Sequence, residues 1–175
     1  MKRCWRRLAY LGIVLCVLCS PFSSRWSPLQ GAEETRGADW LQTSRADFSS
    51  GTLDEVQLLD YADGALSLAV RDEAYRTAGV YTSPVKVADF PFNAIGVQWH
   101  AQLPPTTDLE VSARVSTDGE DWLPWQEVID VSQEGNHFYA LAPLIVESGT
   151  YLQYRVALST DRPTETPLLE DVTLT

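Results

Sequence analysis

The chain has 175 residues, 45% of them hydrophobic, which is enough for one packed domain plus a leader and excludes a disordered composition. Its formal net charge is −11, and all 24 acidic residues lie from Glu33 onward. A surface this acidic repels nucleic acid and anionic lipid, so we set aside both as partners.

The first 32 residues predict a signal peptide and its processing region. Four basic side chains in residues 2–7 precede the apolar run Leu8 to Cys19. That run is shorter than the roughly 20 residues that span a bilayer, but it suits the apolar region of a signal peptide. We therefore expect an extracytoplasmic protein, either secreted after cleavage or tethered by the uncleaved leader as a short N-terminal anchor helix. Residues 33–44 are predicted to be a linker.

The three cysteines are Cys4, Cys16 and Cys19, and all of them lie in the leader. The predicted domain, residues 45–175, therefore has neither a disulfide nor a zinc site built on cysteine. A lipid anchor on Cys16 or Cys19 and a twin-arginine signal at Arg6-Arg7 are the weaker alternatives for the leader.

From Arg45 the sequence predicts strand after strand, because apolar and polar residues alternate over short stretches separated by turn residues. Pro84 interrupts one of these strands, which places that segment at a sheet edge or a bend. The predicted strands cover residues 53–59, 65–70, 79–87, 93–103, 109–116, 128–131, 138–141, 151–158 and 168–174.

This pattern predicts an all-β fold, since no stretch after Gly31 has an apolar period of 3.6 residues over a helical length. The alternation gives each strand one buried and one solvent-exposed face. This favours an antiparallel β-sandwich of jelly-roll or galactose-binding-like type. The predicted core positions include Leu66, Leu68, Val97, Trp99, Val111, Val115, Val156 and Leu174.

The most informative stretch runs from Ser116 to Trp125 and reads STDGEDWLPW. An Asp-Gly dipeptide between two apolar strands predicts a tight hairpin turn. We expect Asp118 to cap the turn and Gly119 to adopt a positive φ, so both have a structural role. The stretch resembles a truncated Asp-box hairpin of sialidase propellers, but a single copy does not predict a propeller.

Trp122 and Trp125 are the candidate ligand-binding residues. Their spacing of three puts them on opposite faces of a strand unless a bulge intervenes at Pro124. One ring would then be in the core, and the other could stack on the apolar face of a sugar. The alternative is that both rings only pack against other side chains of the domain and bind no sugar.

The remaining chemistry-bearing residues do not form an evident site. His100 and His137 lie on separate strands without an acidic or cysteine residue at ligand spacing, so we expect both on the surface. The acidic turn of residues 118–121 could bind calcium or simply be solvated. No serine has a base beside it, and we predict no catalytic residue, no metal and no cofactor.

Several segments together resemble a non-catalytic β-sandwich domain of exported bacterial proteins. They are residues 79–85 (GVYTSPV), 90–99 (FPFNAIGVQW), 114–125, 151–156 (YLQYRV) and 167–174 (PLLEDVTL). That domain often precedes an N-acetylmuramoyl-L-alanine amidase domain of the peptidoglycan-recognition type. The resemblance implies a β-sandwich that accompanies a cell-wall hydrolase. The zinc ligands of such amidases are two histidines and a cysteine, and no cysteine follows Gly31 here.

We therefore expect an exported module that is not an enzyme by itself. Its predicted partners are peptidoglycan or another cell-surface glycan, and an amidase domain in the same or a neighbouring chain. It is either a stand-alone module or a truncated part of a longer amidase. The alternative function is a structural spacer or protein-interaction domain with no sugar site.

Overall fold

The computed structural model describes residues 39–60 and 64–175. The predicted signal peptide and processing region, residues 1–32, lie outside the described residues, so the export of this chain stays a prediction. Within the described ranges, no helix has the length and apolar character needed to span a membrane.

The strands and the helix have the following bounds: β1 Trp40–Gln42, α1 Arg45–Ser49, β2 Thr52–Asp54, β3 Val56–Leu58, β4 Leu66–Leu68, β5 Val70–Arg71, β6 Ala74–Tyr75, β7 Ala78–Thr82, β8 Lys86–Ile95, β9 Val97–Gln102, β10 Thr107–Ser116, β11 Gln126–Glu127, β12 Val131–Glu134, β13 His137–Ala140, β14 Leu144–Thr160 and β15 Leu168–Leu174.

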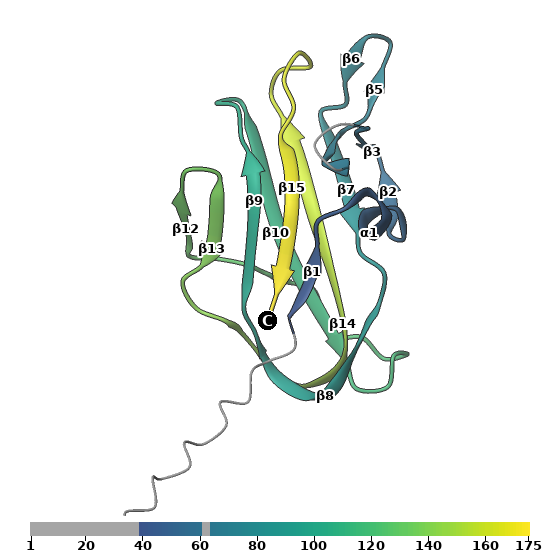
Figure 1. Cartoon of the computed structure of the whole chain (residues 1–175), viewed down its shortest axis with the longest axis vertical. Coiled ribbons are helices and arrows are strands. Elements are labelled where there is room, and N and C mark those ends of the chain that lie inside the picture. Colours follow the sequence, from purple (N-terminus) through teal and green to yellow (C-terminus); the bar gives the residue numbers. More distant parts are fainter. Residues whose placement is uncertain (1–38, 61–63) are drawn as a thin grey trace, which may run out of the picture. The chain divides into compact units, whose positions relative to one another are not determined.

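Two antiparallel sheets form the domain, as Figure 1 shows. The first sheet has the strand order β12-β13-β9-β15-β4-β3, with β1 also paired to β15. The second has the order β11-β10-β14-β7-β2, with β8 also paired to β14. A small hairpin, β5–β6, stands apart from both. The predicted all-β antiparallel sandwich is confirmed.

The core lies between the two sheets, where the inward rows of their strands meet. All eight core positions named from the sequence are buried, with exposed fractions from 0% to 4%. Aromatic rings extend this core: Phe48 packs edge-on against Tyr81, and Tyr81 contacts Tyr154 at 5.9 Å between ring centres. Burial of this large apolar surface is the main favourable contribution to folding.

Two of the strands predicted from the sequence are each divided into two shorter strands, and these belong to different sheets. Residues 93–103 were predicted as one strand, but β8 ends at Ile95 in the second sheet and β9 begins at Val97 in the first. Gly96 lies at this crossing and exchanges two backbone hydrogen bonds with Thr175, at 2.9 and 3.0 Å. The alternation continues across the crossing, because both strands turn the same row of side chains inward.

The chain also changes sheets at Glu55, which lies between β2 of the second sheet and β3 of the first. This crossing divides the predicted strand of residues 53–59. Glu55 has a φ of 53°, which a residue with a side chain rarely adopts. Its carbonyl accepts the Ala69 N–H, and its carboxylate pairs with Arg76 at 2.9 Å. These contacts hold the crossing in place.

The folded domain also begins earlier than Arg45, where the sequence placed its boundary. Trp40–Gln42 was assigned to the linker, but it forms β1 and pairs with residues 172–174 of β15. Gln42 is 3% exposed and accepts a hydrogen bond from the Tyr154 hydroxyl in the core. A three-residue strand is too short for its alternation to be recognised in the sequence.

One short helix, α1, was also missed. Ser44 caps it by accepting the Asp47 N–H, while the Asp47 carboxylate accepts the Ser44 N–H at 3.0 Å. These hydrogen bonds form a capping box, and they lower the pKa of Asp47, chiefly through the bond from the Ser44 side chain. The Ser-x-x-Asp spacing was the available signal, but a five-residue helix gives no apolar period.

Candidate functional site

The turn that follows β10 is organised around Asp118. Its Oδ1 accepts the backbone N–H groups of Glu120 and Asp121, both at 2.9 Å, and the Ser116 hydroxyl at 2.9 Å. These bonds lower the pKa of the Asp118 carboxyl, the Glu120 N–H contributing most. Gly119 has a φ of 84° at the tip of the turn, as the Asp-Gly sequence predicts.

Two tryptophan rings and two arginine side chains alternate in space beside this turn. The guanidinium carbon of Arg114 lies 4.6 Å from the ring centre of Trp122 and 4.5 Å from that of Trp125. The guanidinium of Arg155 lies 4.8 Å from the Trp125 ring centre. We call these four residues, connected in the order Trp122, Arg114, Trp125, Arg155, the Trp–Arg column. Each contact is within the range of a cation–π interaction.

The two tryptophans therefore do not take opposite faces of one strand. The structure shows the alternative that the sequence left open, an interruption at Pro124. Both contact the same guanidinium, and both rings are half-buried. Only an isolated bridge between Ser116 and Trp122 continues the pairing, and residues 123–125 are outside any strand. Pro124 has no N–H for a ladder, so the chain is free to turn Trp125 back over β10.

The arginines of the column are held on the outer face of the second sheet. Arg114 of β10 is directly opposite Gln153 of β14, and its Nε and Nη2 donate to Gln153 Oε1 at 3.0 and 2.6 Å. Gln153 in turn donates to the Ser83 carbonyl at 2.8 Å. The guanidinium orientation is thus fixed by hydrogen bonds as well as by the rings.

The two arginines of the column differ from four other arginines of the domain in their partners. Arg45, Arg71, Arg76 and Arg162 each pair with a carboxylate. Within residues 39–60 and 64–175, no such ion pair is formed by Arg114 or Arg155. Sequence reasoning gave neither arginine a role in the site. Arg114 is on the same hairpin as the tryptophans, whereas only the β10–β14 register brings Arg155 beside that hairpin.

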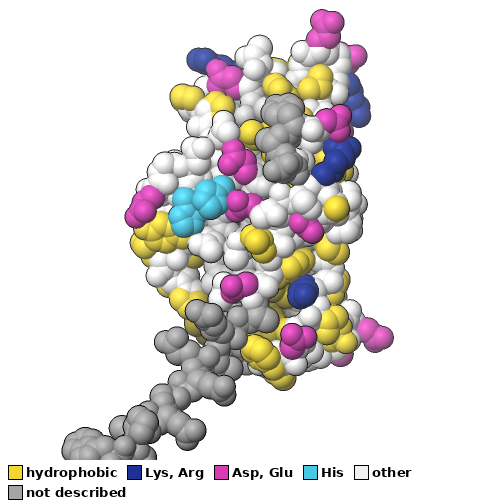
Figure 2. Space-filling view, viewed as in Figure 1, with side chains coloured by type: hydrophobic (Ala, Val, Ile, Leu, Met, Phe, Trp, Pro, Cys, Tyr) yellow, Lys and Arg dark blue, Asp and Glu magenta, His cyan; other side chains and the backbone are white. Residues whose placement is uncertain are grey.

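The two histidines meet on the outer face of the first sheet, where Figure 2 shows them side by side. His137 of β13 lies opposite His100 of β9, with the rings stacked at 4.6 Å between centres. His100 Nδ1 is 3.0 Å from Asp171 Oδ1, a carboxylate that sequence spacing did not indicate. The described ranges hold no cluster of three or more His, Cys, Asp or Glu side chains that could hold a metal ion.

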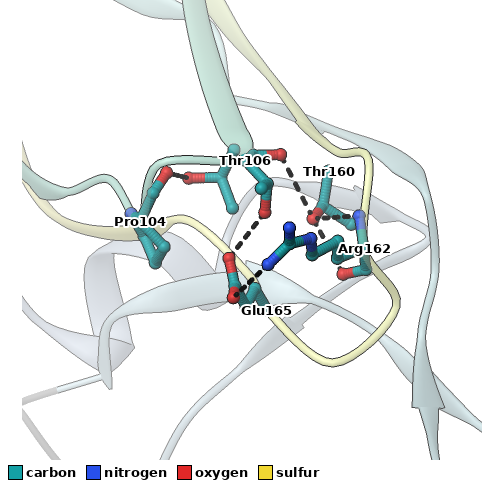
Figure 3. Close-up of polar contacts among 6 residues, drawn as sticks. Pro104, Thr106, Thr160, Arg162 and Glu165 are labelled. Carbon is teal, nitrogen blue, oxygen red and sulfur yellow. Dashed lines mark hydrogen bonds and ion pairs between the residues drawn. The ribbon is translucent and has the colours of Figure 1, made fainter.

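A polar network joins two loops at one end of the sandwich (Figure 3). Thr106 donates to Glu165 at 2.5 Å, and Glu165 also pairs with Arg162 at 3.7 Å. The Thr160 hydroxyl accepts the Arg162 N–H and donates to the Arg162 carbonyl. These contacts tie the β9–β10 loop to the β14–β15 loop.

The solved structures that this chain resembles share low identity with it. One is the enzymatically active domain of tailspike protein 4 from bacteriophage CBA120, with 13% identity, a TM-score of 0.43, and coverage of 80% of this chain and 19% of that one. Another is TmCBM61 in complex with β-1,4-galactotriose, with 10% identity, a TM-score of 0.37, and coverage of 78% and 87%. A third, the CBM22-1–GH10 modules of Clostridium thermocellum xylanase 10B with xylohexaose, has 12% identity, a TM-score of 0.43, and coverage of 78% and 28%.

Such identities and TM-scores assign neither a ligand nor an activity to this chain. The chain also spans only about a fifth of the tailspike domain. No curated protein matches the sequence.

The match of this sequence to a protein family is stronger evidence than these structural likenesses. Residues 37–137 match the family described as the Peptidase C39 N-terminal domain, and they include β1, the strands from β2 to β10 and the Trp122–Trp125 hairpin. Because the match spans more than half of the sequence, this chain belongs to the Peptidase C39 N-terminal domain family.

Proposed function

We propose that this chain is a non-catalytic, extracytoplasmic module that binds a cell-surface glycan through the Trp–Arg column. The observation that carries the proposal is the half-buried ring of Trp122, which ends the column against the guanidinium of Arg114. Among the residues that the structure describes, Arg114 forms no ion pair with a carboxylate. An aromatic ring with donors around it suits a sugar, whose C–H face is apolar and whose hydroxyls accept hydrogen bonds.

Trp122 is the better candidate of the two tryptophans. Trp125 has two guanidinium groups within 5 Å of its ring centre, whereas Trp122 contacts only that of Arg114. Trp125 therefore serves mainly to space the two arginines. We propose that Trp122 provides the stacking surface and that Arg114 and Arg155 donate to sugar oxygens.

The module would hold an attached or partner hydrolase near its substrate. Membership in a family described as the N-terminal domain of a peptidase supports an accessory role next to a catalytic domain. The amidase named by the sequence resemblance stays a prediction, and peptidoglycan is the glycan that this resemblance favours.

The test is retention of the purified protein on insoluble peptidoglycan. We expect Trp122→Ala to lower retention at least about ten-fold, in line with the roughly 1.5–3 kcal/mol that burial of a large apolar side chain contributes, while the thermal midpoint changes little. Leu123→Ala is the matched control, because Leu123 is an exposed neighbour outside the column. Unchanged retention in Trp122→Ala would contradict a sugar site at this ring.

The same experiment distinguishes the spacer alternative. If the column only packs, Trp122→Ala and Trp125→Ala both lower the thermal midpoint, and the wild-type protein is not retained above a neutral control protein. Two half-buried rings covered by guanidinium groups are the observation that favours this alternative.

Export needs a separate measurement. Residues 1–44 fused to a reporter that is active only outside the cytoplasm should give activity, because the basic start and apolar run have the features of a signal peptide. Reporter activity no higher than without the leader would overturn the extracytoplasmic location.

A further inference from the structure

Arg155 is the member of the Trp–Arg column whose N–H donors are not used inside the domain. Its guanidinium lies 4.8 Å from the Trp125 ring centre, and within residues 39–60 and 64–175 its side chain forms neither an ion pair nor a hydrogen bond. Arg114, in contrast, donates twice to Gln153. Since a guanidinium has five N–H donors, Arg155 can supply several to a ligand.

These donors are open to solvent. Among the residues that the structure describes, the buried side-chain nitrogen and oxygen atoms without a hydrogen-bond partner belong to Arg76, Tyr81 and Trp99. The nitrogens of Arg155 are not among them, although the residue is half-buried, so each of them has some exposed surface. Trp125 therefore covers the guanidinium without closing it off from a ligand.

The two arginines of the column are also close to each other. In the β10–β14 register Arg155 is opposite Ser112 and Arg114 is opposite Gln153, so the arginines are diagonal neighbours on the outer face of the second sheet. Such neighbours are about 7–8 Å apart. Two like charges at this spacing repel each other, and a bound anion would reduce the repulsion.

Carboxylates of the domain do not take this place. The chain has 24 acidic residues, and four other arginines of the described ranges each pair with one, so acidic partners are not scarce. Glu110, the other diagonal neighbour of Arg155 on β10, and Glu127 of β11 share the outer face. In the part of the chain that the structure describes, neither forms an ion pair with Arg155. Both carboxylates oppose an external anion, so removing them is a test of the site.

We propose that the Trp–Arg column binds an acidic oligosaccharide, in which a carboxylate on one sugar ring pairs with Arg155 while another ring stacks on Trp122. This inference rests on the proposed function, because the sugar on Trp122 comes from it. Arg114 and Trp125 lie between the two ends of the column, so the ligand extends over more than one sugar. The planar fork of arginine matches the two oxygens of a carboxylate.

The test uses the full chain labelled with ¹⁵N, at about physiological ionic strength, and follows the indole N–H signals of Trp122 and Trp125. These signals are assigned by their loss in Trp122→Phe and Trp125→Phe. The probes are tetragalacturonate, its methyl ester, in which every carboxylate is neutralised, and inorganic phosphate. We expect tetragalacturonate to bind at least about ten-fold more tightly than either of the others, because only it has both the sugar rings and a carboxylate.

Variants locate the carboxylate. Arg155→Gln should lower the preference for the acid over its ester at least about five-fold, and Arg155→Lys, which keeps the charge but not the fork, should lower it less. Arg71→Gln is the matched control, because it removes the same charge from the separate hairpin β5–β6. Glu110→Gln combined with Glu127→Gln should strengthen binding of the acid, since both carboxylates oppose it.

Equal binding of the acid and its ester overturns this inference, as do equal effects of Arg155→Gln and Arg71→Gln. It is also overturned if phosphate binds as tightly as the acid, since the column would then be an anion site without a sugar. If the protein binds neither oligosaccharide but is retained on peptidoglycan, the inference is overturned and the glycan proposal stands. If it binds neither and is not retained, both are overturned, so the two proposals can fail separately.

Discussion

Asp118 shows how one side chain can organise a surface. It accepts three hydrogen bonds in the turn after β10, and the turn in turn positions Trp122 beside Arg114. The same carboxylate was considered as a calcium ligand from the sequence. In the structure its Oδ1 has three protein donors, which gives the acidic residue a role in the fold of the hairpin.

The ionised form of Asp118 should stabilise the folded protein. Its folded pKa is lowered, so this contribution is present above the ordinary carboxyl pKa near 3.8 and is lost as pH falls through the folded value. We predict that the thermal midpoint of the wild type exceeds that of Asp118→Asn at about pH 6, and that the difference shrinks as the pH falls below the ordinary carboxyl pKa of 3.8. Asp121→Asn, whose carboxylate accepts none of these bonds, is the control. A difference independent of pH would contradict the prediction.

At the scale of elements, the crossings at Glu55 and Gly96 decide which strands face each other. At the first crossing, β7 passes so close to Glu55 that only glycine fits at position 79. A Cβ there would lie 2.5 Å from the Glu55 carbonyl oxygen, while a Cβ on Gly96 would have its nearest neighbour at 3.7 Å. A close approach of the backbone therefore requires glycine at position 79, whereas there is room for a Cβ at position 96.

Gly79→Ala should be destabilising, because backbone atoms of Glu55 would have to move. We expect a loss of about 1–3 kcal/mol in the free energy of unfolding, measured by urea denaturation. Gly96→Ala is the matched control and should change that free energy by less than about 0.5 kcal/mol. Equal effects from both substitutions would show that the close approach at Glu55 is not what requires glycine at position 79.

Strand β1 should be part of the stable domain. Removing it leaves the Tyr154 hydroxyl in the core without its acceptor on Gln42 and removes the packing of Trp40 on Tyr154. We predict that a protein starting at Arg45 is about 2–4 kcal/mol less stable than one starting at Asp39, by urea denaturation. Equal stability of the two proteins would support the domain boundary expected from the sequence.

At the scale of the whole molecule, the sandwich is held by an apolar core in which two tyrosines lie deep between the sheets. Tyr81 and Tyr154 are both 0% exposed. Burial raises the pKa of Tyr81 to about 12 and raises the pKa of Tyr154 well above 10. The folded state therefore favours the neutral phenols over the phenolates.

This burial should make the protein sensitive to alkali. Stability from the two tyrosines is fully present below their unfolded pKa of 10.0 and is lost as pH rises towards the folded values. We predict that the free energy of unfolding falls between about pH 10 and 12, by up to about 1.4 kcal/mol per pH unit for each tyrosine. Tyr81→Phe should flatten this dependence, and Tyr139→Phe, on the surface strand β13, should not. A flat profile for the wild type throughout this alkaline range would contradict the prediction.

Much of the fold could be predicted because strand alternation is local. The rows around Leu66, Val97 and Val111 follow from a period of two residues, and a buried row fixes which face is inward. The Asp-Gly turn is local for the same reason. Elements of three to five residues, such as β1 and α1, are too short to show any period, so they could only be found in the structure.

The candidate site was predicted only in part. Trp122, Trp125, Asp118 and Gly119 come from one hairpin, and the sequence singled them out together. Arg155 is 30 positions beyond Trp125, and only the β10–β14 register brings it to that ring. Asp171 reaches His100 in the same way, through the pairing of β15 with β9.

By itself, then, the sequence determined the all-β class, the inward rows and the tight turn, because each depends on residues within a few positions of one another. Only the tertiary structure decided where the chain changes sheets and which side chains cover the two tryptophans. These features depend on which strands pair and in which register, and that choice is made by burial over the whole domain rather than by any one segment.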